Sequence, residues 1–168
     1  MITPEYLQHM ARYNRWQNIH LFAAADTLDD DARRAERGAF FGSIHGTLAH
    51  LLWGDLRWIA RYDGGASTEV PVAESGRWIT QWDDLKSQRR AMDARIIAWA
   101  ETAGPGDIDG MLDLRPSGAT KSFPLPKAVG LMQLFNHQTH HRGQVHAMLT
   151  AAGADSYVTD IPFMPAEA

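Results

Sequence analysis

The chain has 168 residues, 45% of them hydrophobic and 21% charged, which predicts a single soluble domain over residues 1–168 and excludes a disordered or membrane-spanning protein. It has no cysteine, so disulfides, thiolate ligands and cysteine nucleophiles are excluded, and a metal ion would be held by imidazole, carboxylate or water. The formal net charge of −4, with no dense block of lysine and arginine, argues against nucleic acid as a partner, and without a secretory signal the expected location is the cytoplasm.

Two helices are predicted in the first half of the chain. The first spans residues 4–25, where Thr3 can cap the free amides and a proline occupies the first helical position. Residues 26–42 are polar and are expected to be irregular. The second helix runs from the capping residue Ser43 to about Tyr62, where the sequence "DGG" ends it.

Two more helices are predicted in the second half, with a short hairpin between them. After Thr80, apolar residues recur at intervals of three, four and seven until the sequence "AGPG". Between 107 and 123, apolar and charged residues alternate and "RPSGA" supplies turn residues, which predicts the hairpin. The last helix is predicted from about Leu125, with Pro126 in its first turn, to Gly153.

The four long helices, without internal repeats, predict an all-α fold. We expect a four-helix bundle with a short hairpin or irregular insertion between the third and fourth helices. Residues 154–168 contain two prolines and show no clear period. They are expected to fold back over the bundle as a lid or a brace.

The sequence "FNHQTHHRGQVH", at 135–146, contains four of the eight histidines. On a helix, His137 and His141 lie about 40° apart, with Cβ atoms roughly 5–6 Å from each other, and the apolar stripe of this helix is centred close to His141. His140 and His146 point elsewhere. The pair therefore faces inward, either as metal ligands or as core histidines bonded to backbone and water. Gln138 occupies the position that holds the glutamate base of a zincin, so peptide hydrolysis of that kind is disfavoured.

A third ligand would have to come from His9, His20, His45 or His50. His9 and His20 are about 16 Å apart along their helix, so at most one could join. His45 and His50 are about 140° apart and are not expected to point inward together. Glycines at 46 and 54 flank His50, which indicates either a space kept open around it or close helix packing. Helical geometry alone leaves the choice open.

Three blocks of the sequence resemble the DinB family of damage-inducible four-helix metalloproteins, also described as DinB/YfiT-like. They are "YNRWQN", "FFGSIHGTLAHLLWGDLRWIARYDG" and "LFNHQTHHRGQVHAMLTAAG", and they cover nearly the whole chain in the expected order. The resemblance implies a divalent ion held by one histidine of the second helix and two of the last. Carried over to this sequence, these are His50, His137 and His141.

The resemblance also implies a function. Relatives include bacillithiol-dependent S-transferases and mycothiol-dependent maleylpyruvate isomerases, which use a metal to activate a thiol, while many members have no established activity. We therefore expect a metal-dependent enzyme such as a thiol S-transferase, with a small-molecule substrate, a bound Zn, Ni or Fe ion, a low-molecular-weight thiol as a further cofactor, and a homodimeric assembly. The alternatives are a metal-dependent hydrolase and a non-catalytic stress protein with a structural metal ion.

Three further residues are candidates for a supporting role around the ion. Asp55 lies near the centre of the apolar stripe of its helix and is expected to pair with Arg89 or to bond to a ligand histidine. His140 is either an acid or base beside the site or a half-exposed side chain. Gln144 lies about 20° from His137 around the helix and is expected to contact substrate or a water on the ion.

Overall fold

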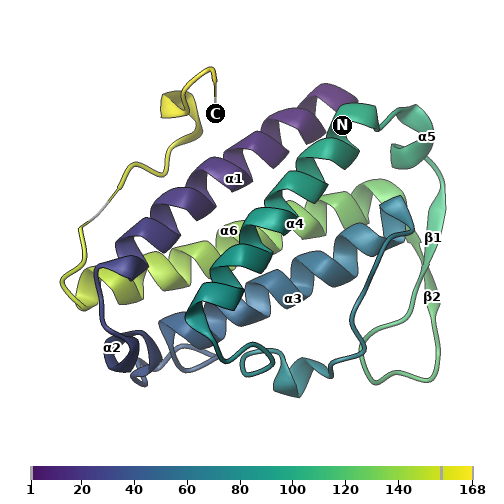
Figure 1. Cartoon of the computed structure of the whole chain (residues 1–168). Helices are drawn as coiled ribbons and strands as arrows, with labels where there is room; N and C mark the ends of the chain where they lie inside the picture. The colour runs from purple at the N-terminus through teal and green to yellow at the C-terminus, as the bar shows by residue number, and fades with distance from the viewer. Residues whose placement is uncertain (1, 156, 168) are drawn as a thin grey trace.

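Four long helices form the protein in the computed structural model, which describes residues 2–155 and 157–167. They are α1 (Pro4–Asp26), α3 (Ile44–Asp63), α4 (Trp82–Thr102) and α6 (Lys127–Ala151), and they lie side by side in Figure 1. α3 packs on α4 and α6, and α1 packs on the same two helices. The predicted all-α four-helix bundle is confirmed. In the described part of the chain, no helix is both long and apolar enough to span a membrane.

The predicted caps are present at the start of the first two long helices and at the end of the second. The Thr3 side chain accepts a hydrogen bond from the backbone N–H of Tyr6 at 3.2 Å, and the Ser43 hydroxyl accepts one from the N–H of Gly46 at 3.0 Å. Each satisfies an amide that the first helical turn leaves free. α3 ends at Gly64, which has a φ of 65° and terminates the helix in the left-handed region.

Two short helices occur where the sequence predicted irregular chain. α2 (Asp30–Arg34) lies within residues 26–42 and is capped by Asp29, whose side chain accepts from the N–H of Ala32. α5 (Pro105–Ile108) follows α4 directly, with its proline at the first helical position. The cap and proline signals are local, but each helix is too short to show an apolar period.

The predicted hairpin is present, but its second strand lies further along the chain than expected. β1 (Met111–Leu114) pairs antiparallel with β2 (Phe123–Pro126). Leu125 and Pro126, predicted to be in the first turn of the last helix, are therefore in β2. A residue before proline favours extended backbone, and proline is tolerated in a two-stranded ribbon, which has only edges. The helix begins at Lys127, after the last proline.

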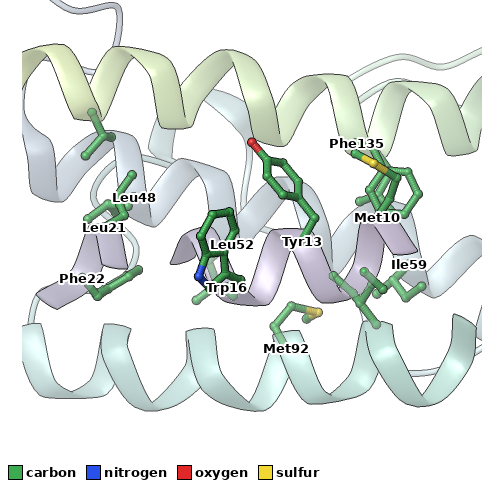
Figure 2. Packing of buried hydrophobic residues seen from close by; sticks show 14 of the residues in the cluster. Met10, Tyr13, Trp16, Leu21, Phe22, Leu48, Leu52, Ile59, Met92 and Phe135 are labelled. Carbon is green, nitrogen blue, oxygen red and sulfur yellow. The ribbon is translucent and has the colours of Figure 1, made fainter. Parts of the chain in front are cut away.

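The core is formed by apolar side chains from all four long helices, which meet between the ribbons in Figure 2. Tyr13 and Trp16, whose helical spacing is typical of core aromatics, are buried. The largest fully buried side chains are Phe135, Leu7, Leu21, Ile44, Leu48, Leu51, Leu52, Ile59, Leu85, Ile96, Leu131 and Leu134.

A chain of buried polar side chains also crosses the bundle, and we call it the polar chain. Asp55 pairs with Arg89 at 2.5 Å, and Arg89 pairs with Asp93 at 2.9 Å. Gln138 donates to Asp55 and accepts a hydrogen bond from Arg142. Two carboxylates balance two guanidinium groups, so the net buried charge is close to zero. In order, the polar chain is Asp93, Arg89, Asp55, Gln138, Arg142 and Asn14, with members from all four long helices.

The C-terminal segment lies along α1 and braces it. The hydroxyl of Tyr13 donates to the carbonyl of Thr159 at 2.6 Å, and the side-chain amide of Gln17 donates to the carbonyl of Val158 at 3.0 Å. The ring of Tyr157 stacks on His146 of α6, with centroids 4.7 Å apart. Of the two roles expected for this segment, these contacts support the brace.

Candidate metal centre

Three histidines converge between α3 and α6. His50 comes from α3, and His137 and His141 come from adjacent turns of α6. One ring nitrogen of each lies within 4.8 Å of the others, and the Nε2 atoms of His50 and His137 are 3.1 Å apart. His50 and His141 are buried, and His137 is half-buried. The structure thus brings together the three histidines that the family resemblance selected.

The hydrogen bond behind His50 determines which of its nitrogens can bind an ion. Its Nδ1 atom lies 2.8 Å from the hydroxyl of Ser75, and that hydroxyl donates its only hydrogen to the carbonyl of Val72 at 2.6 Å. Ser75 must therefore accept, so Nδ1 of His50 carries the proton. The lone pair of His50 is on Nε2, which faces His137.

The same argument applies to His141. Its Nδ1 atom lies 2.7 Å from Oε1 of Gln144, and an amide oxygen can only accept. Nδ1 of His141 therefore carries the proton, and its Nε2 is left with a lone pair. Gln144, which the sequence suggested as a contact for substrate or water, instead orients a histidine of the triad.

His137 approaches α3 closely because position 54 has no side chain. A Cβ atom on Gly54 would lie 2.6 Å from Cε1 of His137 and 3.0 Å from its Nδ1. A Cβ atom on Gly46 would collide with the carbonyl of Phe41. Both glycines therefore allow close packing, and the idea that they keep a space open around His50 is wrong.

Aromatic rings enclose the triad on the side of α3. Phe41 stacks on His50 with centroids 3.7 Å apart and meets His141 edge-on at 5.6 Å. Trp53 stacks on His50 from one turn further along, at 5.4 Å. Sequence reasoning missed Phe41 because it lies in the stretch predicted to be irregular. No periodic signal marks a loop residue that folds onto a helix.

Burial keeps the triad neutral. It lowers the pKa of His50 to about 3, with the neighbouring His137 and His141 contributing, and it lowers the pKa of His137 to about 4, with contributions from His141 and His140. Burial also lowers the pKa of His141. Imidazole must be neutral to bind a metal ion, so all three are available as ligands at pH 7.

The other histidines lie away from this centre or make different contacts. His45 is buried, and its Nε2 lies 2.8 Å from the carbonyl of Ile79. His45 and His50 do not share one site, and both are nevertheless buried because α3 is covered on more than one side. His140 is exposed, with its ring 4.8 Å from that of His141. His146 stacks on Tyr157.

Asp55 supports the triad only at a distance. Its Oδ2 atom accepts from Arg89 and from Gln138, rather than from a histidine. Of the two roles considered for this carboxylate, the pairing with Arg89 is the one present. Gln138 is nevertheless the neighbour of His137 in α6, so the polar chain fixes the helical turn that carries the triad.

The donor set fits a divalent cation. Two nitrogens bound to one Zn²⁺ at about 2.0–2.1 Å in a tetrahedral arrangement lie roughly 3.3 Å apart, close to the 3.1 Å between His50 and His137. Nδ1 of His137 is buried without a hydrogen-bond partner among the described residues, so either of its nitrogens can carry the proton. With that proton on Nδ1, each histidine of the triad has its lone pair on Nε2.

Comparisons with known proteins identify the family of this chain. A family model described as the DinB family matches residues 1–168. Protein DinB of Bacillus subtilis (strain 168) is 28% identical over 155 residues, a match that covers 88% of this chain and 87% of that protein. The family match extends over the entire bundle and includes all three histidines of the triad. The chain therefore belongs to the DinB family.

Proposed function

We propose that this protein is a divalent-metal-dependent enzyme whose ion is held by His50, His137 and His141. The observation that carries the proposal is the convergence of three neutral imidazoles, two of which are held by Ser75 and Gln144 with their lone pairs on Nε2. Zn²⁺, Ni²⁺ and Fe²⁺ all suit three nitrogen donors.

The bound ion would supply Lewis acidity, which favours the deprotonated form of a thiol or water and polarises an electrophile. The protein's own residues supply the setting. Phe41 and Trp53 pack on His50 and exclude water from that side, which strengthens electrostatic interactions at the centre. His137 is half-buried, so its side chain is partly accessible to solvent. By family resemblance, the leading reaction is transfer of a low-molecular-weight thiol to an electrophile.

A structural ion is the competing function. Structural zinc sites usually have four protein ligands, whereas catalytic sites have three and keep one position open. In the part of the chain that the structure describes, the group of side chains able to share an ion contains three histidines and no carboxylate. This donor count favours catalysis. Gln138 is buried and bonded to Asp55, so it is not arranged to assist hydrolysis from the zincin position.

The first experiment is elemental analysis of protein purified without a histidine tag. We expect about one divalent ion per chain in the wild type and loss of most of it in His50→Ala and His137→Ala. His146→Ala, on the opposite side of α6, should keep the ion. Equal metal content in all four proteins would refute the site.

The second experiment is an activity screen of the metal-loaded protein. Electrophiles are offered with and without glutathione, and simple esters are offered alone. Thiol-dependent turnover that disappears in His137→Ala supports the transferase. Ester hydrolysis without a thiol supports the hydrolase, and full metal occupancy with no turnover in either assay supports a structural ion.

A further inference from the structure

A basic pocket lies on the C-terminal half of α3, apart from the histidine triad. Its volume is about 510 Å³. Three guanidinium groups and three hydroxyl groups line it, and Asp113 is its one carboxylate. The lining residues that matter here are Arg57 and Arg61 of α3, Ser67 of the following loop, and Arg115, Thr120 and Ser122 of the hairpin connection.

Asp113 is the one carboxylate among the lining residues, so it offsets only part of the positive charge of this pocket. None of the ion pairs among residues 2–155 and 157–167 involves Arg57, Arg61 or Arg115. Asp113 accepts a hydrogen bond from Ser122 at 2.7 Å. Three clustered cations in a chain with a net charge of −4 are an unfavourable arrangement unless an anion joins them.

Most of the hydrogen-bonding capacity of the two helical arginines is still free. Arg57 donates to the carbonyl of Thr68 at 2.8 Å, and Arg61 donates to the carbonyl of Arg57. A guanidinium group has five N–H donors, so each retains several. Burial, with a contribution from the neighbouring Arg57, lowers the pKa of Arg61.

The pocket lies on the same side of α3 as the triad. Arg57 and Arg61 follow His50 by seven and eleven residues, which places each of them within about 20° of His50 around the helix, on either side of it, and puts Arg57 about 10 Å beyond His50. Trp53 connects them: its ring contacts His50 at 5.4 Å and the guanidinium of Arg57 at 5.2 Å.

The loop after α3 runs along this side of the helix and contacts the same residues in turn. Ser75 bonds to His50, the carbonyl of Val70 accepts from the indole N–H of Trp53 at 2.9 Å, and Thr68 bonds to Arg57. One loop therefore holds both the triad histidine and the pocket arginine in position.

We propose that this pocket binds the phosphate or carboxylate group of an anionic small molecule, and that such a molecule is the substrate class presented to the triad. Guanidinium groups bind both anions through paired hydrogen bonds, and the surrounding hydroxyls add donors. The binding of an anion is argued from the pocket alone. The presentation of that molecule to the triad rests on the proposed metal-dependent function.

The pocket is tested first on metal-free protein, so that the result does not depend on the ion. Inorganic phosphate and succinate are titrated separately, and binding is followed through the indole N–H signals of the six tryptophans. We expect saturable shifts of the Trp53 signal, assigned with Trp53→Phe. Arg61→Gln and Arg115→Gln should raise the Kd at least tenfold. The probe that binds more tightly identifies the anion.

Arg90→Gln is the matched control, because it removes the same charge from an exposed position on α4. Its Kd should equal that of the wild type. Two results would overturn the pocket: the absence of saturable binding for both probes, or equal weakening in Arg90→Gln and Arg61→Gln, which would indicate general surface charge.

The link to the triad is tested on metal-loaded protein with a mercaptocarboxylic acid that spans about 10 Å, the helical rise over seven residues. It should bind at least tenfold more tightly than the mercaptoalcohol of the same length, and Arg61→Gln should abolish the difference. Equal binding of the two thiols to the wild type would refute the link while leaving the metal site standing. Absence of metal would refute the proposed function while leaving the phosphate and succinate result standing.

Discussion

Single side chains behind the imidazole rings determine what the triad can bind. Ser75 and Gln144 hold the protons of His50 and His141 on Nδ1, and Nε2 is left free on both. Partners of this kind usually contribute a factor of 10–100 to metal affinity, since they fix both the tautomer and the ring orientation. Neither belongs to the triad, so their effect can be separated from loss of a ligand.

Replacing Ser75 by alanine should weaken metal binding without unfolding the protein. The N–H of His50 would lose its acceptor, and the ring would be free to rotate or to move its proton to Nε2. We expect the metal Kd to rise about 10- to 100-fold in a chelator competition assay. Ser87→Ala, at an exposed position of α4, should leave the Kd unchanged. An unaltered Kd in the Ser75 variant would contradict the tautomer argument.

Replacing Gly54 by alanine should displace His137, because the new methyl group would lie 2.6 Å from its ring. A glycine-to-alanine change inside a helix normally stabilises a protein by about 0.5–1 kcal/mol. Here we expect lower stability and loss of metal. Gly143→Ala in α6 is the control, since its Cβ would meet nothing within 4 Å, and it should stabilise. Urea unfolding and metal analysis of both variants make the comparison. A stabilised, metal-binding Gly54→Ala would show that His137 does not need this space.

The four long helices are connected by the polar chain as well as by apolar packing. Asp55 of α3 binds Arg89 of α4 and Gln138 of α6, so one carboxylate joins three helices. Ion pairs of this kind add little net stability, because burying the charges costs about as much as their attraction returns. Their effect is on arrangement: each helix must keep its register for the donors and acceptors to meet. The turn of α6 that carries His137 is held in this way.

Replacing Asp55 by alanine should destabilise the protein strongly. Arg89 would remain buried with only Asp93 to balance it, and Gln138 would lose an acceptor. We expect a loss of about 3–5 kcal/mol in the free energy of unfolding, measured by urea denaturation of the metal-free protein. Asp30→Ala, which removes an exposed pair with Arg34, should cost less than about 1 kcal/mol. Similar losses of unfolding free energy in the two variants would mean that the burial of Asp55 does not increase the cost of removing its carboxylate.

The stability of the whole molecule should depend on pH through its buried ionisable groups. An unfolded histidine titrates near pH 6.5, whereas His50 and His137 titrate near 3 and 4 in the fold. Between these values the unfolded chain binds more protons, so stability is lost as the pH falls. Asp55 acts in the opposite direction, because burial raises its pKa to about 6. As the pH falls, this carboxylate is protonated in the folded protein before it is protonated in the unfolded chain, which favours the folded state. The two histidines outweigh the one carboxylate.

We therefore expect metal-free protein to lose roughly 1–2 kcal/mol of stability between pH 6 and pH 5, from about one net proton at 1.4 kcal/mol per pH unit. His141, whose pKa is also lowered, adds to the loss. Urea unfolding at several pH values measures the slope. His137→Ala should make it shallower, while His9→Ala should not. A free energy of unfolding that increases as the pH falls from 6 to 5 would show that the triad is not neutral in the folded protein.

Local sequence patterns were enough to predict the four long helices, the N-terminal caps of α1 and α3, the presence of a hairpin, and the location of His137 and His141 on one face of a helix. These features depend on contacts within a few residues, and helical geometry repeats wherever a helix forms. The same local rules failed at Leu125 and Pro126, where strand pairing with β1 prevailed over a helical first turn. His50 came from resemblance to a family, since the helical periodicity of α3 did not choose between it and His45.

The side chains that surround the triad could not be predicted in this way. Ser75, Phe41 and Gly54 meet the histidines because the loop after α3, the segment before it and α6 all converge on one side of α3. His45 and His50 are both buried for the same reason, as different neighbours cover the two sides of that helix. Such contacts join residues far apart in sequence. They are set by how preformed helices and loops pack together, which no repeating local pattern encodes.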